Sequence, residues 1–333
     1  MALRCWIRWV SWLALSLAPG VCASNEATPE VVAPEVAAPE AAASAAALQG
    51  VPEAARAAAR STAEWLARGV DSWFGDRPFE EGGKVSDGRM SIGVLKRQGE
   101  RADVDVRFTA HFRLPNVERN AYLFVGRDDR RDAVRDTPDA IATQRKLLSP
   151  RLAEPSFLVG LGLSLRDAVD FRLGFAHGLK PYAQARYDHA WPFAPDHLIA
   201  FRETVFWTNA DRFGSTTALS YNVTMSPRLV VRWLGAITIT QETRNLEWSS
   251  SLGAYQSFAG LRLLSFEALL NGSGTQGTGV GESDRGLLVK WEQPIHERWL
   301  FAEVVAGHFW PRRDAASARG RAWAAGGSLK MRF

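Results

Sequence analysis

The chain has 333 residues, of which 46% are hydrophobic and 23% are charged. This is close to ordinary globular usage and excludes disorder over most of the length. The 40 Lys and Arg against 36 Asp and Glu leave a formal charge of +4, too even a balance to indicate a protein that binds nucleic acid. The 13 Trp and 17 Phe are a high aromatic load that needs a location in the fold.

Residues 1–23 have the pattern of a secretory signal peptide. Arg4 and Arg8 form a positive start, residues 10–21 are an apolar stretch too short to span a bilayer, and residues 21–23 provide a cleavage site. A lipid anchor on Cys22 is the alternative. Both cysteines of the chain lie in this segment, so we expect no disulfide, cysteine metal site or cofactor in the mature protein.

Two further segments precede the main domain. Residues 24–50 repeat Ala, Pro, Glu and Val, a composition that cannot bury enough apolar surface to fold, so we expect a disordered periplasmic linker. Residues 51–87 are predicted to form an amphipathic helix, over about 52–74, and a connector. This helix would pack at the edge of the main domain, plug a pore or touch a membrane surface.

From about residue 88 the hydrophobic period changes to two, which indicates β-strands. The stretch 102–114 alternates over some thirteen residues, longer than the ~5–6 typical of globular strands and enough for a tilted transmembrane strand of about 9–11. Similar alternation recurs to the end of the chain. Arg262, Glu267 and Glu303 fit the pattern poorly.

Connection lengths provide an independent test. Counted back from residue 333, long connections at 311–320, 271–284 and 128–155 alternate with short ones at 294–298, 256–260 and 226–228. Strong alternation of this kind is typical of a barrel in which all long loops leave at one side of a membrane. We therefore predict that residues 88–333 form an all-β, closed antiparallel transmembrane barrel of 12–14 strands. Closure also removes unpaired strand edges, and the aromatic residues would form belts at the membrane interfaces.

The last eight residues, 326–333, end on an aromatic residue preceded by alternate apolar positions, Leu329 and Met331 before Phe333. This ending resembles the assembly signal of Gram-negative outer-membrane β-barrel proteins. The resemblance covers about residues 88–333 and implies the outer membrane as location, with the N-terminal segment in the periplasm. It also implies outer-membrane lipid, lipopolysaccharide and the barrel assembly machinery as partners. Residues 65–74 and the pair Leu114-Pro115 are similar to uncharacterised proteobacterial barrels, which implies no activity.

Candidate chemical sites are weak. Residues 272–277 match G-x-G-x-x-G, but a strand pattern follows where a nucleotide site needs a helix, so we expect a surface loop and no nucleotide. The six His show no metal-ligand spacing, and the Asp residues of 128–139 alternate with Arg and lack the calcium-loop pattern. We therefore expect no metal, and a solvated loop whose Arg side chains contact lipopolysaccharide phosphates.

The inward faces of the predicted strands carry charges of both signs. Such charges in a barrel require a wet lumen or internal ion pairs, and the mixture predicts neither anion nor cation selectivity. The residues expected to line the lumen are Asp103, Asp105, Arg107, His111, Arg113, Asp170, Arg172, Arg186, Asp188, Arg202, Arg232, Lys290, Lys330 and Arg332.

A wet lumen favours a channel or binding protein for small polar solutes, which is our first hypothesis for function. An ion-paired lumen favours a structural or envelope-assembly barrel without transport. An outer-membrane lipid-modifying hydrolase is the third hypothesis and would pair His111 with Ser164 or Ser220, although no local motif orders such a pair.

Overall fold

A computed structural model gives the fold. The residues that it describes are 53, 56–57, 60–61, 64, 84–113, 120–148, 155–165, 168–176, 178–259, 261–275, 279–296, 299–312 and 318–333, without the side chains at 84–85, 275 and 279–280. The predicted signal peptide and linker lie outside these residues.

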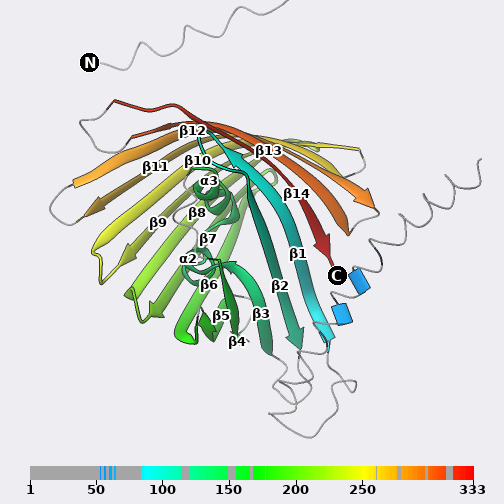
Figure 1. Cartoon of the computed structure of the whole chain (residues 1–333), viewed down its shortest axis with the longest axis vertical. Helices are drawn as coiled ribbons and strands as arrows, with labels where there is room; N and C mark the ends of the chain where they lie inside the picture. The colour runs from blue at the N-terminus through cyan, green and yellow to red at the C-terminus, as the bar shows by residue number, and fades with distance from the viewer. Residues whose placement is uncertain are drawn as a thin grey trace, which may run out of the picture. The chain divides into compact units, whose positions relative to one another are not determined.

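The main domain is a closed antiparallel barrel of 14 strands, the upper end of the predicted range. Every strand pairs with its neighbours in sequence, and β1 pairs with β14 to close the ring (Figure 1). The strands are β1 (Lys84–Arg97), β2 (Asp103–Arg113), β3 (Ala121–Asp129), β4 (Pro155–Leu165), β5 (Val169–Ala176), β6 (Lys180–Ala194), β7 (His197–Thr208), β8 (Arg212–Ser226), β9 (Leu229–Thr240), β10 (Asn245–Phe258), β11 (Arg262–Thr275), β12 (Gly279–His296), β13 (Leu300–Pro311) and β14 (Ala322–Arg332).

The connections separate the two ends of the barrel. We call the end where β1 begins and β14 ends the terminal end, and the opposite end the helix end. Connections at the terminal end include the short turns 195–196 and 227–228, whereas the helix end carries the two longest, 130–154 and 312–321. The predicted alternation of connection lengths holds for these loops.

The predicted loop at 271–284 is wrong. β11 continues to Thr275 and β12 begins at Gly279, so only 276–278 connect them. The glycines that suggested a loop permit close strand approach instead: a Cβ on Gly272 would lie 2.2 Å from the backbone oxygen of Gly281 and 2.4 Å from the indole nitrogen of Trp248.

The C-terminal residue completes the seam of the barrel. The backbone N–H of Phe333 donates to the oxygen of Gly88 at 2.9 Å, and its ring covers Gly88 where any Cβ would clash. Met331 pairs with Met90 in the register of this seam, and Leu329 pairs with Ile92. The three residues of the expected assembly signal therefore belong to the last strand and the residue after it.

The outward face carries a belt of apolar side chains, as a lipid-facing surface requires. Exposed members include Val94, Phe157, Leu173, Ile237 and Leu252. The predicted aromatic belt is present in part, because Trp191, Phe193, Trp233 and Trp323 are exposed on this face, whereas Trp299 is buried.

A carboxylate also lies on the outward face. Glu203, in the middle of β7, pairs with Thr217 of β8, whose hydroxyl donates to it at 2.6 Å, and Ser215 donates to its other oxygen. Polar side chains on a lipid-facing surface need such partners, because lipid supplies none.

The N-terminal helix is described at six positions only. Glu53, Arg56, Ala57, Arg60, Ser61 and Glu64 are helical, with an ion pair between Arg60 and Glu64 at 3.0 Å. The guanidinium of Arg56 lies 5.2 Å from the ring centre of Trp299 at the terminal end. The first strand begins at Lys84, four residues earlier than predicted.

Candidate functional site in the barrel lumen

The connection between β3 and β4 folds into the barrel. It forms two helices, α2 (Arg130–Arg135) and α3 (Asp139–Leu148), which Figure 1 shows within the ring of strands. Of the wall strands, α2 lies against β3, β4, β6, β7 and β8, and α3 lies against β13 and β14. The expectation of a solvated loop is therefore wrong for these residues, whereas the expected contact with lipopolysaccharide stays a prediction.

Local capping explains why α2 starts and stops where it does. The Asp129 side chain accepts from the backbone N–H of Arg131 at 2.9 Å and of Asp132 at 3.3 Å, as a helix N-cap does. Asp136 adopts the left-handed conformation with φ 51°, and its N–H donates to the oxygen of Asp132, which ends the helix.

Apolar side chains of the helices pack on several parts of the inner wall of the barrel. Val134 packs with Phe124, Leu158 and Phe206, whereas Ile141 packs with Ala218 and its neighbours on β9. Near the end of α3, Leu147 joins a third cluster, formed with the wall residues Leu269, Leu288, Phe309 and Ala324. The two helices thus cross the lumen and obstruct it in the half nearer the helix end.

Ion pairs fasten α2 to the turn between β7 and β8 and to β10. Arg135 contacts Asp211 at 3.0 Å and Glu247 at 3.3 Å, and Arg131 contacts Glu247 at 2.8 Å. The Arg135 side chain is only 7% exposed. A buried guanidinium is tolerated there because two carboxylates neutralise it.

The α3 helix is fastened to β1, β2 and β3. Lys146 lies 3.7 Å from Asp105 and 3.6 Å from Asp128, and its backbone oxygen accepts from Arg97 Nε at 2.9 Å. Asp132 of α2 and Arg145 of α3 form an ion pair at 2.8 Å that joins the two helices. Burial raises the pKa of Asp132 above its ordinary value, and Arg145 offsets part of this effect.

Several buried polar side-chain atoms in this packing have no hydrogen-bond partner among the described residues, namely atoms of Asp132, Arg135 and Gln144. Asp132 and Arg135 are charged and keep their ion pairs. Gln144 of α3 is completely buried, and among the described residues neither its amide nitrogen nor its oxygen has a hydrogen-bond partner. A buried unpaired amide costs about 1–3 kcal/mol. The docked position of α3 therefore carries a penalty that the apolar contacts and ion pairs must outweigh.

A network of charges lies on the wall between α2 and the terminal end. Asp136 is approached by Arg186 at 3.7 Å and Arg202 at 3.5 Å, and accepts from the Thr204 hydroxyl at 3.1 Å. Asp188 bridges the same two arginines at 2.8 and 2.6 Å. The side chains of Arg202 and Asp188 are 40% and 36% exposed, so solvent reaches this network.

The network continues toward the terminal end through Asp170. Its carboxylate accepts from Tyr122 Oη at 2.8 Å, from Ser164 Oγ at 3.0 Å and from Arg172 Nε at 3.0 Å. Arg172 Nε also donates to Tyr122 Oη at 2.9 Å. The Ser164 hydroxyl thus points to a carboxylate, and not to the His111 that the hydrolase hypothesis would pair with it.

The opposite wall carries two more clusters. On β9–β11, Arg232 donates to Tyr255, whose hydroxyl donates to Glu267 at 2.8 Å. On β12–β14, Lys330 lies 2.9 Å from Glu292 and 2.5 Å from Glu303, and Lys290 lies 3.6 Å from Glu303. Charges of both signs therefore surround the lumen.

The register places all the predicted lumen residues on the face opposite the apolar belt, and the structure joins many of them into these clusters. Asp105 and Arg107 pair with each other at 2.6 Å. Asp103 pairs with Leu95 of β1, and Arg332 places its guanidinium 5.1 Å from the Phe301 ring centre. The His111 ring lies 5.4 Å from that of Tyr122, and Arg113 lies at the terminal edge opposite Lys84.

Sequence reasoning missed several residues of the lumen network. Glu267 and Glu303 had a signal, because they interrupt an apolar pattern and the structure turns both inward. Tyr122, Asp136 and Tyr255 have no such signal in the sequence, since their partners lie on other strands. The residues missed in this way are Tyr122, Arg131, Arg135, Asp136, Gln144, Lys146, Glu247, Tyr255, Glu267, Glu292 and Glu303.

Within the described residues, no group of three or more His, Cys, Asp or Glu side chains is arranged to hold a metal ion. None of the described helices has the length and apolar character that crossing a membrane demands.

No protein-family model matches the sequence, and comparison with curated proteins finds no match either. The chain is similar to several solved structures at low identity. Outer-membrane expressed OmpT of Vibrio cholerae has 10% identity and a TM-score of 0.44, over 75% of this chain and 98% of that one. OccK5 of Pseudomonas aeruginosa has 10% identity and a TM-score of 0.40, over 76% of this chain and 99% of that one. The KdgM porin in complex with disordered oligogalacturonate has 7% identity and a TM-score of 0.36, over 74% of this chain and 99% of that one.

Proposed function

We propose that the chain is a bacterial outer-membrane channel for small polar solutes, narrowed by α2 and α3. The observation that carries the proposal is the solvent-reached network around Asp136, where Arg186, Arg202 and Asp188 line the lumen beside the inserted helix. A barrel without passage has no need for exposed charges on its inner wall, since apolar packing fills a lumen at lower desolvation cost.

The mixed charges suggest the class of solute. Because Arg and Asp side chains alternate around the network, neither an anion nor a cation meets a ring of one sign. Small neutral or zwitterionic polar solutes fit such a lining best. Hydroxyl, ammonium and carboxylate groups on one molecule would each find a complementary group there.

The topology supports an orientation with the terminal end in the periplasm. In bacterial outer-membrane barrels the short turns lie on the periplasmic side and the long loops on the other, and the short turns 195–196 and 227–228 lie at the terminal end. In this orientation the polar network faces the periplasm, and α2 and α3 lie toward the cell exterior. The assembly machinery would then meet Leu329, Met331 and Phe333 from the periplasm.

Single-channel recording tests the proposal. The chain lacking residues 1–23 would be refolded and inserted in a planar bilayer, beside a form in which a Gly-Ser linker replaces 131–147. We expect discrete steps from the first and larger ones from the second. Arg202→Glu should shift the reversal potential toward cations, whereas Arg228→Glu, in the exposed turn 227–228, should leave it unchanged.

A structural barrel without transport is the second candidate. It is favoured by the buried contacts of Val134, Ile141 and Leu147 with different parts of the barrel wall. Conductance steps that appear only when the Gly-Ser linker replaces 131–147 would overturn the open channel in favour of a plugged barrel. Silence from both correctly folded forms would overturn the channel altogether.

A further inference from the structure

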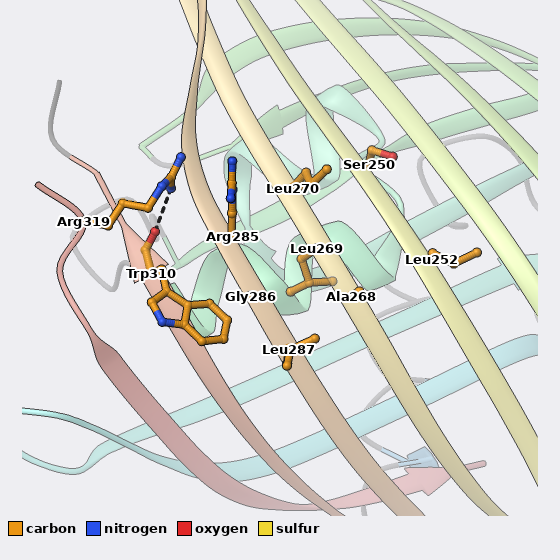
Figure 2. A pocket seen from close by; sticks show the side chains of 10 residues that line it. All are labelled: Ser250, Leu252, Ala268, Leu269, Leu270, Arg285, Gly286, Leu287, Trp310 and Arg319. Carbon is orange, nitrogen blue, oxygen red and sulfur yellow. Dashed lines mark hydrogen bonds between the residues drawn. The ribbon is translucent and has the colours of Figure 1, made fainter. Parts of the chain in front are cut away.

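A groove runs along the outward surface of the barrel over β10–β13, away from the lumen. It has a volume of about 640 Å³, within the ~300–1,000 Å³ typical of small-ligand clefts. The leucines that line it are Leu252, Leu270 and Leu287, each about half exposed, and Leu269, which is buried. Figure 2 shows these side chains along β10, β11 and β12, with Arg285, Arg319 and Trp310 toward one end.

The strand register explains the depression. In one row of outward positions, Ser250 of β10 pairs with Leu270 of β11. In the next row, Leu252 of β10 pairs with Ala268 of β11, and Ala268 pairs with Leu287 of β12. Ser250 and Ala268 are small, so the leucines beside them stand above a hollow. The hollow is accordingly built of side chains that would otherwise face the acyl chains of the membrane.

Two guanidinium groups stand at the end of the groove nearer the helix end. Arg285 pairs with Glu282 through two nitrogens, one at 3.0 Å from Oε2. Arg319 Nη2 donates to the same carboxylate at 2.9 Å, and its Nη1 donates to the backbone oxygen of Trp310 at 3.1 Å. The two guanidiniums share the Glu282 carboxylate, so these three side chains together carry one positive charge.

From this geometry we propose that the groove binds an anionic lipid, with an acyl chain along the leucines and the headgroup phosphate at Arg285 and Arg319. Guanidinium groups bind phosphate oxygens through paired, charge-assisted hydrogen bonds. The Arg285 side chain is 54% exposed and can turn toward a phosphate without leaving a buried charge behind. The apolar groove and the positive charge together match the two ends of one amphiphile, which neither feature does alone.

This inference rests on the membrane location in the proposed function but not on transport. A barrel with no conductance would bind the lipid equally well. The proposal commits to a lipid as occupant; a second copy of the chain seated on the groove is an outcome that the experiment below would detect.

Photo-crosslinking tests the site. The refolded barrel would be placed in phosphatidylcholine vesicles holding a small fraction of phosphatidylglycerol with a photoactivatable acyl chain, and labelled peptides mapped by mass spectrometry. A phosphatidylcholine probe with the same acyl chain is the control. We expect the anionic probe to label peptides of β10–β12 in excess over the other outward strands, and the control probe to label all outward strands evenly.

Four variants separate the two parts of the site. Ala268→Trp fills the groove and should remove the excess labelling, whereas Ala254→Trp, at an outward position nearer the terminal end of β10, should not. Arg285→Gln should lower the excess about tenfold, the effect of losing one charge-assisted bond. Arg212→Gln, an exposed arginine at the same end of the barrel, is its control.

Glu282→Gln gives the sharpest result. Removing the shared carboxylate frees both guanidiniums, so labelling by the anionic probe should increase while labelling by the control probe stays constant. Equal labelling by both probes, unaffected by Arg285→Gln and Glu282→Gln, would overturn the site and leave a plain depression in the belt. Protection of β10–β12 from both probes would instead indicate a second copy. Absence of labelling on every outward strand would overturn the membrane barrel itself.

Discussion

Replacing Arg135 with Met should release α2 from the wall of the barrel. Removing one partner of a fully buried ion pair costs about 3–5 kcal/mol. Here Asp211 is 17% and Glu247 37% exposed, and Glu247 keeps Arg131 at 2.8 Å. We therefore expect about 2 kcal/mol, which makes the undocked state of α2 about 30-fold more populated.

Hydrogen exchange of the refolded barrel measures this population directly. Peptides covering 130–148 should exchange about 30-fold faster in Arg135→Met, with the strands unchanged, because local opening sets their rate. Arg131→Met is the matched control: its partner Glu247 is more exposed and keeps Arg135, so a cost below about 1 kcal/mol is expected. Equal effects of the two substitutions, or none, would show that apolar packing alone holds α2 and would refute the electrostatic argument.

Four further substitutions test other parts of the fold by urea unfolding of the refolded barrel. Glu203→Gln should raise the unfolding free energy by about 1 kcal/mol, since it removes a charge from the lipid-facing surface; a loss of stability would contradict this. Gly160→Ala should lower the unfolding free energy by about 2 kcal/mol or more, because its Cβ would lie 2.2 Å from a backbone oxygen of β5. Gly327→Ala is the control and should change the unfolding free energy by under about 0.5 kcal/mol, because the nearest atom to its Cβ would be 3.6 Å away. The raised pKa of Asp132 means that the folded state holds this proton more tightly than the unfolded state, so stability should fall as pH rises above the ordinary value of 3.8. Asp132→Asn should flatten that decline, and an unchanged pH slope would exclude Asp132 as its cause.

The barrel wall was predictable from sequence because its determinants are local. Alternation with a period of two marks each strand, and turn residues such as Pro227 mark the ends. Gly272 shows where this reasoning fails: a glycine marks either a turn or a close approach of two strands, and only the partner strand distinguishes them. Here Trp248 and Gly281 occupy the space that a side chain would need.

The lumen was less predictable because its determinants are distant in sequence. The alternating Arg and Asp residues around Arg131 have the local pattern of a solvated loop, yet the carboxylates of Asp211 and Glu247 bind them inside the barrel. Only Glu267 and Glu303 gave a local signal, as charges that interrupt an apolar pattern. Alternation along one sequence divides the side chains of a strand between its two faces, but it does not indicate which of them meet across the lumen.

The pairing of β1 with β14 has a consequence for the order of folding. Arg89 pairs with Arg332, so the ring cannot close until the last residues of the chain are available, and pairings so distant in sequence are slow to form. The helices α2 and α3 lie early in the chain, yet they dock on Glu247, Leu269 and Phe309, which follow much later. The interior of the barrel is therefore completed together with its wall, and the arginines of α2 stay exposed to water until β10 is in place.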